Sequence, residues 1–179
     1  MALRPIHLLG SPVLRQHSDE VTCVDDEVRK LVRDLFDTMY TAEGIGLAAN
    51  QVGLTIRVAV VHAGDDPAVV LINPVIIERE GNEKDEEGCL SLPDLFGDVD
   101  RALRVVVETT NLDGARERHE LTALSARAVQ HEIDHLDGKL FIDHLSPLKR
   151  LMLLKKWKKL RKGQKGYIEE VSPAKTPGS

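Results

Sequence analysis

The sequence predicts an α+β fold in which mainly antiparallel sheets surround a central metal-binding helix. Helical periodicity occurs near both ends of the 179-residue chain, whereas short β-rich runs separated by turn residues fill its middle. Residues 131–135 read HEIDH and fall in the second predicted helix. Two histidines four residues apart share one helix face, so both can reach a single metal ion.

The first helix is predicted from Asp25 or Asp26 to about Thr41. Either aspartate can cap the helix, and apolar residues recur at helical spacing along one face. The next segment, GIGLAANQ at 44–51, contains two glycines. It predicts a loop with unusual backbone angles, or a place where the backbone approaches a ligand closely.

Four strands are predicted in the middle of the chain from β-rich composition and flanking turn residues. They span 57–62, 69–77, 104–110 and 116–121. A second helix is predicted from Ala123 to about Asp137, ending near Gly138.

A third, basic helix is predicted at 146–162, with Ser146 as its N-cap and Pro147 at its first position. We expect one catalytic domain at 1–166. The polar, proline-containing sequence of 167–179 predicts a disordered tail.

The composition is that of a soluble globular protein. The chain is 42% hydrophobic and 30% charged. It shows neither the apolar run of a signal peptide nor a stretch long enough to span a membrane, and two cysteines do not make a disulfide framework. A 3% aromatic content argues against a stacking platform for single-stranded nucleic acid. We therefore expect a cytoplasmic location.

The net charge of −5 conceals a basic C-terminal segment. Residues 146–166 carry nine basic side chains and no acidic one, which favours contact with an anionic partner. The alternative is a solvated helix face beside an apolar one. The basic residues are Lys149, Arg150, Lys155, Lys156, Lys158, Lys159, Arg161, Lys162 and Lys165.

The HEIDH segment indicates a metal-assisted hydrolase. Glu132 lies beside the first histidine, where it can take the proton of a metal-bound water. Asp134 lies on a different helix face from His131 and His135, and we assign it no catalytic role. The alternative is an exposed helix with two solvated histidines.

A catalytic metal site usually has three protein ligands and an open position for water. Cys89, Cys23, the other histidines and many carboxylates are candidates for the third ligand. A lone cysteine is most often a small buried hydrophobe, which is our interpretation of Cys23. Cys89 follows a glycine that leaves room for a ligand, so its context supports either interpretation.

Three segments together resemble the motifs of the peptide deformylases, and they occur in that family's order. GIGLAANQ at 44–51 fits the glycine-rich motif, EGCLS at 87–91 the cysteine motif, and HEIDH at 131–135 the metal helix. The likeness spans about residues 4–160 and is to iron-type, bacterial-like members. It implies removal of the N-formyl group from the initiator methionine of new polypeptides, with release of formate.

The resemblance also implies roles for individual residues. Cys89, His131 and His135 would bind one divalent ion. Glu132 would move the proton from the water to the leaving amine. The side-chain amide of Gln51 and the backbone N–H of Leu90 would stabilise the oxyanion.

Substrate binding is expected along the glycine-rich segment and the metal helix. Gly46 would hydrogen-bond an extended peptide through its backbone, and Ile45 is a candidate wall of the methionine pocket. Leu124 and Ala128 share the helix face of His131 and are further candidates, the alternative being that they are simply core. Near Cys89, Glu87 and Arg101 form a candidate supporting pair.

Histidine and thiolate suit zinc, iron, cobalt and nickel alike, so spacing does not select the ion. The resemblance favours Fe²⁺, with Zn²⁺, Ni²⁺ or Co²⁺ as other occupants. It implies a nascent N-formylmethionyl polypeptide as partner and docking of helix 146–162 on the ribosome. The location would be the bacterial cytoplasm, or an organellar stroma or matrix for a processed chain.

Two other classes of protein remain as alternatives. A metallopeptidase that cuts internal peptide bonds shares the two histidines and the glutamate. A non-catalytic ribosome-binding protein could have kept the fold, although intact Glu132 and Gln51 argue against it.

Overall fold

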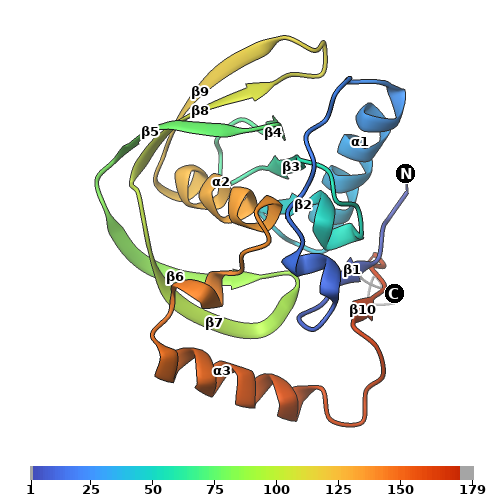
Figure 1. Ribbon diagram of the computed structural model, residues 1–179, viewed down its shortest axis with the longest axis vertical. Coiled ribbons are helices and arrows are strands. Elements are labelled where there is room, and N and C mark those ends of the chain that lie inside the picture. The colour runs from blue at the N-terminus through green and yellow to red at the C-terminus, as the bar shows by residue number, and fades with distance from the viewer. Residues whose placement is uncertain (1, 174–179) are drawn as a thin grey trace, which may run out of the picture.

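The computed structural model describes residues 2–173, and it confirms the α+β architecture (Figure 1). Helix α2 (Ala123–Leu136) lies in the middle, with strands on several sides of it. The other helices are α1 (Asp26–Thr41) and α3 (Pro147–Leu160), and three short 3-10 helices are η1 (Pro12–Arg15), η2 (Ala49–Val52) and η3 (Phe141–His144).

The strands form small sheets in which every ladder is antiparallel. Their orders are β2-β3-β4, β5-β8-β9, β6-β7 and β1-β10. Their bounds are β1 (Ile6–His7), β2 (Gly46–Ala48), β3 (Val58–Val61), β4 (Val69–Ile72), β5 (Val75–Glu80), β6 (Glu83–Cys89), β7 (Leu92–Arg101), β8 (Arg104–Thr110), β9 (Arg116–Thr122) and β10 (Ile168–Glu169).

Helix α1 confirms the sequence-based prediction, with Asp25 as its cap. The Asp25 carboxylate accepts a hydrogen bond from the backbone N–H of Val28 at 3.0 Å. The apolar stripe faces the core, where Leu35 and Met39 are fully buried, while Phe36 is half-buried. Apolar burial on one face is thus what places α1 against the sheet.

A second apolar cluster packs α2 against the surrounding strands. On the helix it includes Val129, Ile133 and Leu136, and on the strands it includes Val61 and Val107. This packing buries the apolar face of α2, while Glu87 and Cys89 of β6 lie against the two histidines on its polar face, so the helix is largely buried.

The glycine-rich segment is not simply the predicted loop. Gly46 to Ala48 form β2, which pairs with β3, and η2 follows immediately. Leu47, Ala48 and Ala49 are fully buried, so pairing with β3 satisfies backbone groups that a buried loop would leave unbonded.

The predicted strand at 69–77 is two strands in different sheets. The chain turns at Asn73, whose φ of 49° is positive and whose side chain exchanges two hydrogen bonds of 2.8 Å with the backbone of Val21. Strands β4 and β5 therefore lie on either side of this turn.

The hairpin of β6 and β7 was not predicted at all. Its first strand reads EKDEEGC, in which charged residues replace the β-branched residues that favour strands. Pairing with β7 holds the strand, and this pairing is a tertiary contact that the local sequence does not reveal.

The prediction of disorder from residue 167 onward is wrong for residues 167–173. Strand β10 pairs with β1, and the N–H of Leu8 donates to the carbonyl of Tyr167 at 2.7 Å. Residues 174–179 lie outside the part of the chain that the structure describes.

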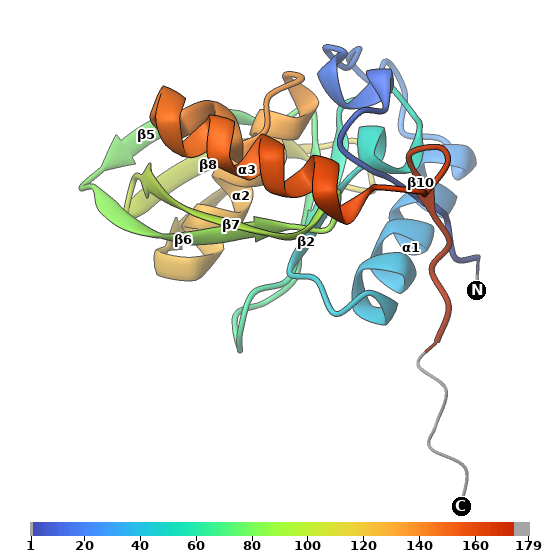
Figure 2. The same cartoon turned by 90° about the horizontal axis from the view of Figure 1, so that it is seen from below.

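Helix α3 matches the predicted basic helix to within two residues at its C-terminus. It lies across the β6-β7 hairpin and contacts β7 (Figure 2). Trp157 is its buried residue, and the indole N–H donates to the carbonyl of Leu9 at 3.1 Å. Within residues 2–173, no helix has the length and apolarity needed to cross a membrane.

We predict that Thr109→Val lowers the free energy of unfolding by about 1–3 kcal/mol, because it leaves a buried N–H unsatisfied. Thr109 of β8 is fully buried, and its hydroxyl accepts from the N–H of Ile72 in β4 at 2.7 Å, which joins two sheets. Chemical denaturation measures the change. Thr110→Val is the matched control on the opposite face of the strand, and an equal loss there would contradict the assigned role.

Candidate metal centre

The structure brings Cys89, His131 and His135 together with their ligand atoms all within 4.8 Å of one another. The Sγ of Cys89 lies 3.3 Å from the Nε2 of His135, which lies 3.1 Å from the Nε2 of His131. The two histidines occupy successive turns of α2, and Cys89 comes from the end of β6. Cys23 is exposed, not buried as expected, and lies outside this group.

The residues fit a divalent cation. The Nδ1 of His131 lies 2.9 Å from the Glu87 carboxylate, and an N–H on Nδ1 directs the lone pair of Nε2 towards Cys89 and His135. Burial alone would lower the pKa of His131, but the neighbouring Cys89 and Glu87 raise it well above the ordinary value. The thiolate and the Glu87 carboxylate thus place negative charge around the two imidazoles, which suits a cation between Cys89, His131 and His135.

Glu87 is the centre of a buried ionic group that we call the Glu87 cluster, consisting of Glu87, Arg101, Arg127 and His131. Arg101 donates twice to the Glu87 carboxylate, at 2.8 and 2.9 Å, and Arg127 donates once at 2.8 Å. Burial alone would raise the pKa of Glu87, but the hydrogen bonds from Arg101 and His131 hold it far below its usual range. The carboxylate is therefore charged.

The predicted pairing of Glu87 with Arg101 is thus confirmed as a contact. The contribution of Arg127 was missed. Its position four residues before His131 on α2 places it on the same face, and this spacing could have indicated it.

Glu132 lies beside the metal-ligating group and is almost completely buried. Burial raises the pKa of this carboxyl to about 7. Its Oε2 has no hydrogen-bond partner among the described residues. A Cβ at Gly46 would lie only 2.8 Å from the Cδ of Glu132, so a side chain at this position would displace the Glu132 carboxylate.

Gln51 is buried, contrary to the usual exposure of a loop glutamine. Its Oε1 accepts from the N–H of Ala48 at 2.9 Å. Its Nε2 donates to the hydroxyl of Ser91 at 3.0 Å and lies 3.7 Å from the sulfur of Cys89. Leu90 follows Cys89 in the turn between β6 and β7. Gln51 and Leu90 therefore both border the metal-ligating group.

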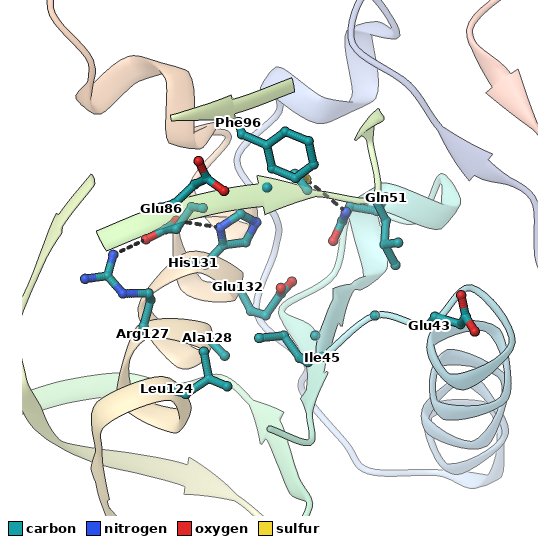
Figure 3. A pocket seen from close by; sticks show the side chains of 16 residues that line it. Glu43, Ile45, Gln51, Glu86, Phe96, Leu124, Arg127, Ala128, His131 and Glu132 are labelled. Atoms are coloured by element: carbon teal, nitrogen blue, oxygen red, sulfur yellow. Dashed lines mark hydrogen bonds and ion pairs between the residues drawn. The ribbon is translucent and has the colours of Figure 1, made fainter. Parts of the chain in front are cut away.

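A cavity of about 370 Å³ opens next to Glu132 (Figure 3). Figure 3 shows Ile45, Ala128 and Leu124 gathered on one side of Glu132, and His131 on the other. Ile45 and Leu124 are 41% and 48% exposed, so Leu124 is not core, whereas Ala128 is buried in the α2 cluster and also lines the cavity.

Several cavity residues were not predicted. Phe96 of β7 lies at the cavity and is 54% exposed. Glu43 and Glu86 also line it. A single aromatic in a strand that was itself not predicted carries no sequence signal, so only the folded hairpin shows its place.

We predict that Arg101→Ala lowers the affinity for a divalent cation about 10–100-fold, because Glu87 would no longer be held against His131. The free energy of unfolding should fall by about 3–5 kcal/mol, since Glu87 loses a buried partner. Arg104→Ala is the matched control, because Arg104 also contacts several carboxylates but on the surface. Chelator competition measures the affinity. A variant Arg101→Ala that binds the cation as tightly as wild type would contradict the role of Arg101 in holding Glu87.

Comparisons with known proteins agree with this geometry. Residues 3–151 match the polypeptide deformylase family. The peptide deformylase of Acidobacterium capsulatum is 48% identical over 166 residues, which cover 90% of this chain and 98% of that protein. A crystal structure of a peptide deformylase from Legionella pneumophila has a TM-score of 0.85 and 40% identity, covering 91% of this chain and 98% of that one.

A peptide deformylase from Ehrlichia chaffeensis in complex with actinonin has a TM-score of 0.87 and 35% identity, covering 92% of this chain and 100% of that one. The family match and the identity over nearly the whole length agree with the three motifs. The chain therefore belongs to the peptide deformylases, metal-dependent hydrolases that remove the N-formyl group from the N-terminal methionine of new polypeptides.

Proposed function

We propose that this chain deformylates nascent N-formylmethionyl polypeptides at one divalent cation held by Cys89, His131 and His135. The observation that carries this proposal is the convergence of three ligand atoms within 4.8 Å beside the buried Glu132 carboxylate, whose Oε2 has no hydrogen-bond partner among the described residues. Three protein ligands leave a position for water, as catalytic sites require. When bound, the cation supplies a Lewis acid that lowers the pKa of that water.

Glu132 acts as the general base and then as the general acid. Its burial beside the cavity raises its pKa to about 7, and a cation nearby would lower it again. A carboxyl that titrates below or near neutrality can take a proton from water and return it to the leaving amine.

Gln51 and Leu90 stabilise the oxyanion that develops on the formyl oxygen when water adds to the formyl carbon. The Gln51 amide is held by Ala48 and Ser91 with its nitrogen near Cys89. Such a fixed donor costs little reorganisation when the negative charge develops. A thiolate ligand leaves the cation with less net charge than three histidines would, which increases the need for these donors.

The substrate binds as an added strand. β2, which contains Gly46, is an edge strand of its sheet and lies at the cavity, so its backbone can pair with an extended peptide. Ile45, Leu124 and Ala128 supply an apolar wall for the methionine side chain. Backbone pairing is insensitive to the residues that follow, as a general processing enzyme requires.

Helix α3 docks on the ribosome at the exit of the peptide tunnel, in the bacterial cytoplasm. Its basic side chains suit RNA phosphates, and Leu148, Leu151 and Met152 form an exposed apolar face beside them. The acidic remainder of the chain would not attract RNA by itself.

Comparing a formyl-methionyl peptide with its unblocked form tests the reaction. We predict formate release from the first and no cleavage of either at internal bonds. Glu132→Gln should retain the cation and lower kcat about 100–10,000-fold, because the proton carrier is lost. Cleavage of the unblocked peptide would favour a metallopeptidase, and full turnover by the variant would exclude Glu132 as the base.

Fe²⁺ is the proposed native ion. A ferrous ion beside a thiolate is sensitive to oxidation, so anaerobic purification should raise the specific activity above that of protein prepared in air. Metal content and deformylation are measured on the same samples. Equal activity of both preparations at full zinc occupancy would contradict the iron assignment.

Charge reversal on α3 tests ribosome docking without disturbing Trp157. We predict that Lys155→Glu with Lys159→Glu abolishes co-sedimentation with ribosomes at low salt but leaves turnover of a free peptide unchanged. Arg33→Glu with Lys84→Glu makes the same change of charge on exposed residues elsewhere. Ribosome binding that survives the α3 reversal, or that does not weaken with salt, would contradict this docking surface.

A further inference from the structure

The Glu87 cluster continues to the protein surface through residues that the proposed mechanism does not use. Arg101 donates its third hydrogen bond from Nη1 to the Asp134 carboxylate, at 2.6 Å. The same carboxylate oxygen lies 2.7 Å from the Nε2 of His144, which is on η3. An unbroken chain of polar contacts therefore runs from His131 to His144.

Asp134 follows the helical phase that the sequence predicted, and it points away from the metal-ligating group towards Arg101. Burial alone would raise its pKa, but His144 and Arg101 hold that pKa below the ordinary value, so the group is a carboxylate. Together Glu87 and Asp134 balance the charges of Arg101 and Arg127, all four side chains being largely buried.

The geometry of Arg101 makes this series of polar contacts rigid. A guanidinium is planar, and two of its N–H groups are committed to Glu87, so its orientation sets that of the Glu87 carboxylate. The bond to Asp134 prevents rotation of the guanidinium. Glu87 in turn sets the orientation of the His131 ring.

His144 lies at the solvent-exposed end of this series of polar contacts. Its side chain is 37% exposed, whereas that of Asp134 is 18% exposed. The preceding residues of η3, Phe141 and Ile142, are buried in the core, and they fix the backbone that carries the His144 side chain. Without His144, the Asp134 carboxylate would lose one of these two contacts, and Arg101 alone would hold it.

We propose that His144 is a positioning residue for the metal ligand His131, acting through Asp134, Arg101 and Glu87. It touches neither the cavity nor the metal-ligating group. The inference rests on the proposed metal site, and it adds a residue on η3, just before α3, whose hydrogen bond helps to set the affinity and geometry of that site.

The test measures Co²⁺ binding to the full chain, because Co²⁺ with thiolate and imidazole ligands has visible absorption that reports their geometry. We expect His144→Ala to weaken Co²⁺ binding about 10-fold, to shift the visible bands, and to lower kcat without changing KM for a formyl-methionyl peptide. His144→Gln, which keeps an N–H donor for Asp134, should restore affinity and spectrum to within about twofold of wild type.

His119→Ala is the matched control. The Nε2 of His119 contacts Glu117 at 2.9 Å, with a similarly exposed side chain, but on β9 away from the site. It should bind Co²⁺ like wild type. Wild-type affinity and spectrum in His144→Ala would overturn the inference even if the metal-free form melted at a lower temperature. So would a His144→Gln variant as defective as His144→Ala.

Co²⁺ binding by the wild-type protein distinguishes failure of the proposed metal site from failure of the positioning role of His144. If wild type binds Co²⁺ and the His144 variants behave like it, only the positioning role fails. If wild type does not bind Co²⁺, the proposed metal site itself is wrong and the positioning role is overturned with it.

Discussion

The structure of the site depends on one buried carboxylate, that of Glu87. It lies on β6 and is bonded by Arg101 of β7 and by Arg127 and His131 of α2. It is therefore the charged contact that ties the cysteine-bearing hairpin to the metal helix. Burying these charges costs desolvation energy that an apolar pair would not, so their value lies in orientation more than in stability.

The remaining parts of the site are arranged around this contact. Fixing the hairpin places Cys89 against the two histidines and puts Leu90 and Ser91 beside Gln51. On the other side of α2, the edge strand β2 passes Glu132 so closely that a side chain at Gly46 would collide with it. The rigid sheets thus hold donors, base and ligands in place before any substrate binds.

Elements whose sequence signal is local were predicted well from the sequence. Helix α1, helix α2 with its pair of histidines, and the start of α3 at Ser146 follow from periodicity and capping. Strand β10 was missed because its partner, β1, lies near the other end of the chain. The strands of the β6-β7 hairpin are neighbours in sequence, and they were missed because the charged residues of β6 are not those that favour strands. The glycine-rich segment was taken for a loop because its two glycines favour loops and its strand, β2, is defined only by pairing with β3.

By itself, the sequence determined the chemistry available: two histidines on one helix face with a glutamate between them, and, through the resemblance, the reaction. Helical geometry makes that part of the site local, since four residues along a helix complete about one turn. The residues alone left the third ligand open, and the resemblance indicated Cys89. Only the tertiary structure decided how Cys89 meets the histidines, that Gln51 is buried, and that Phe96 and His144 lie near the site or are connected to it. These facts depend on long-range packing and on the pairing of buried charges, which no local pattern encodes.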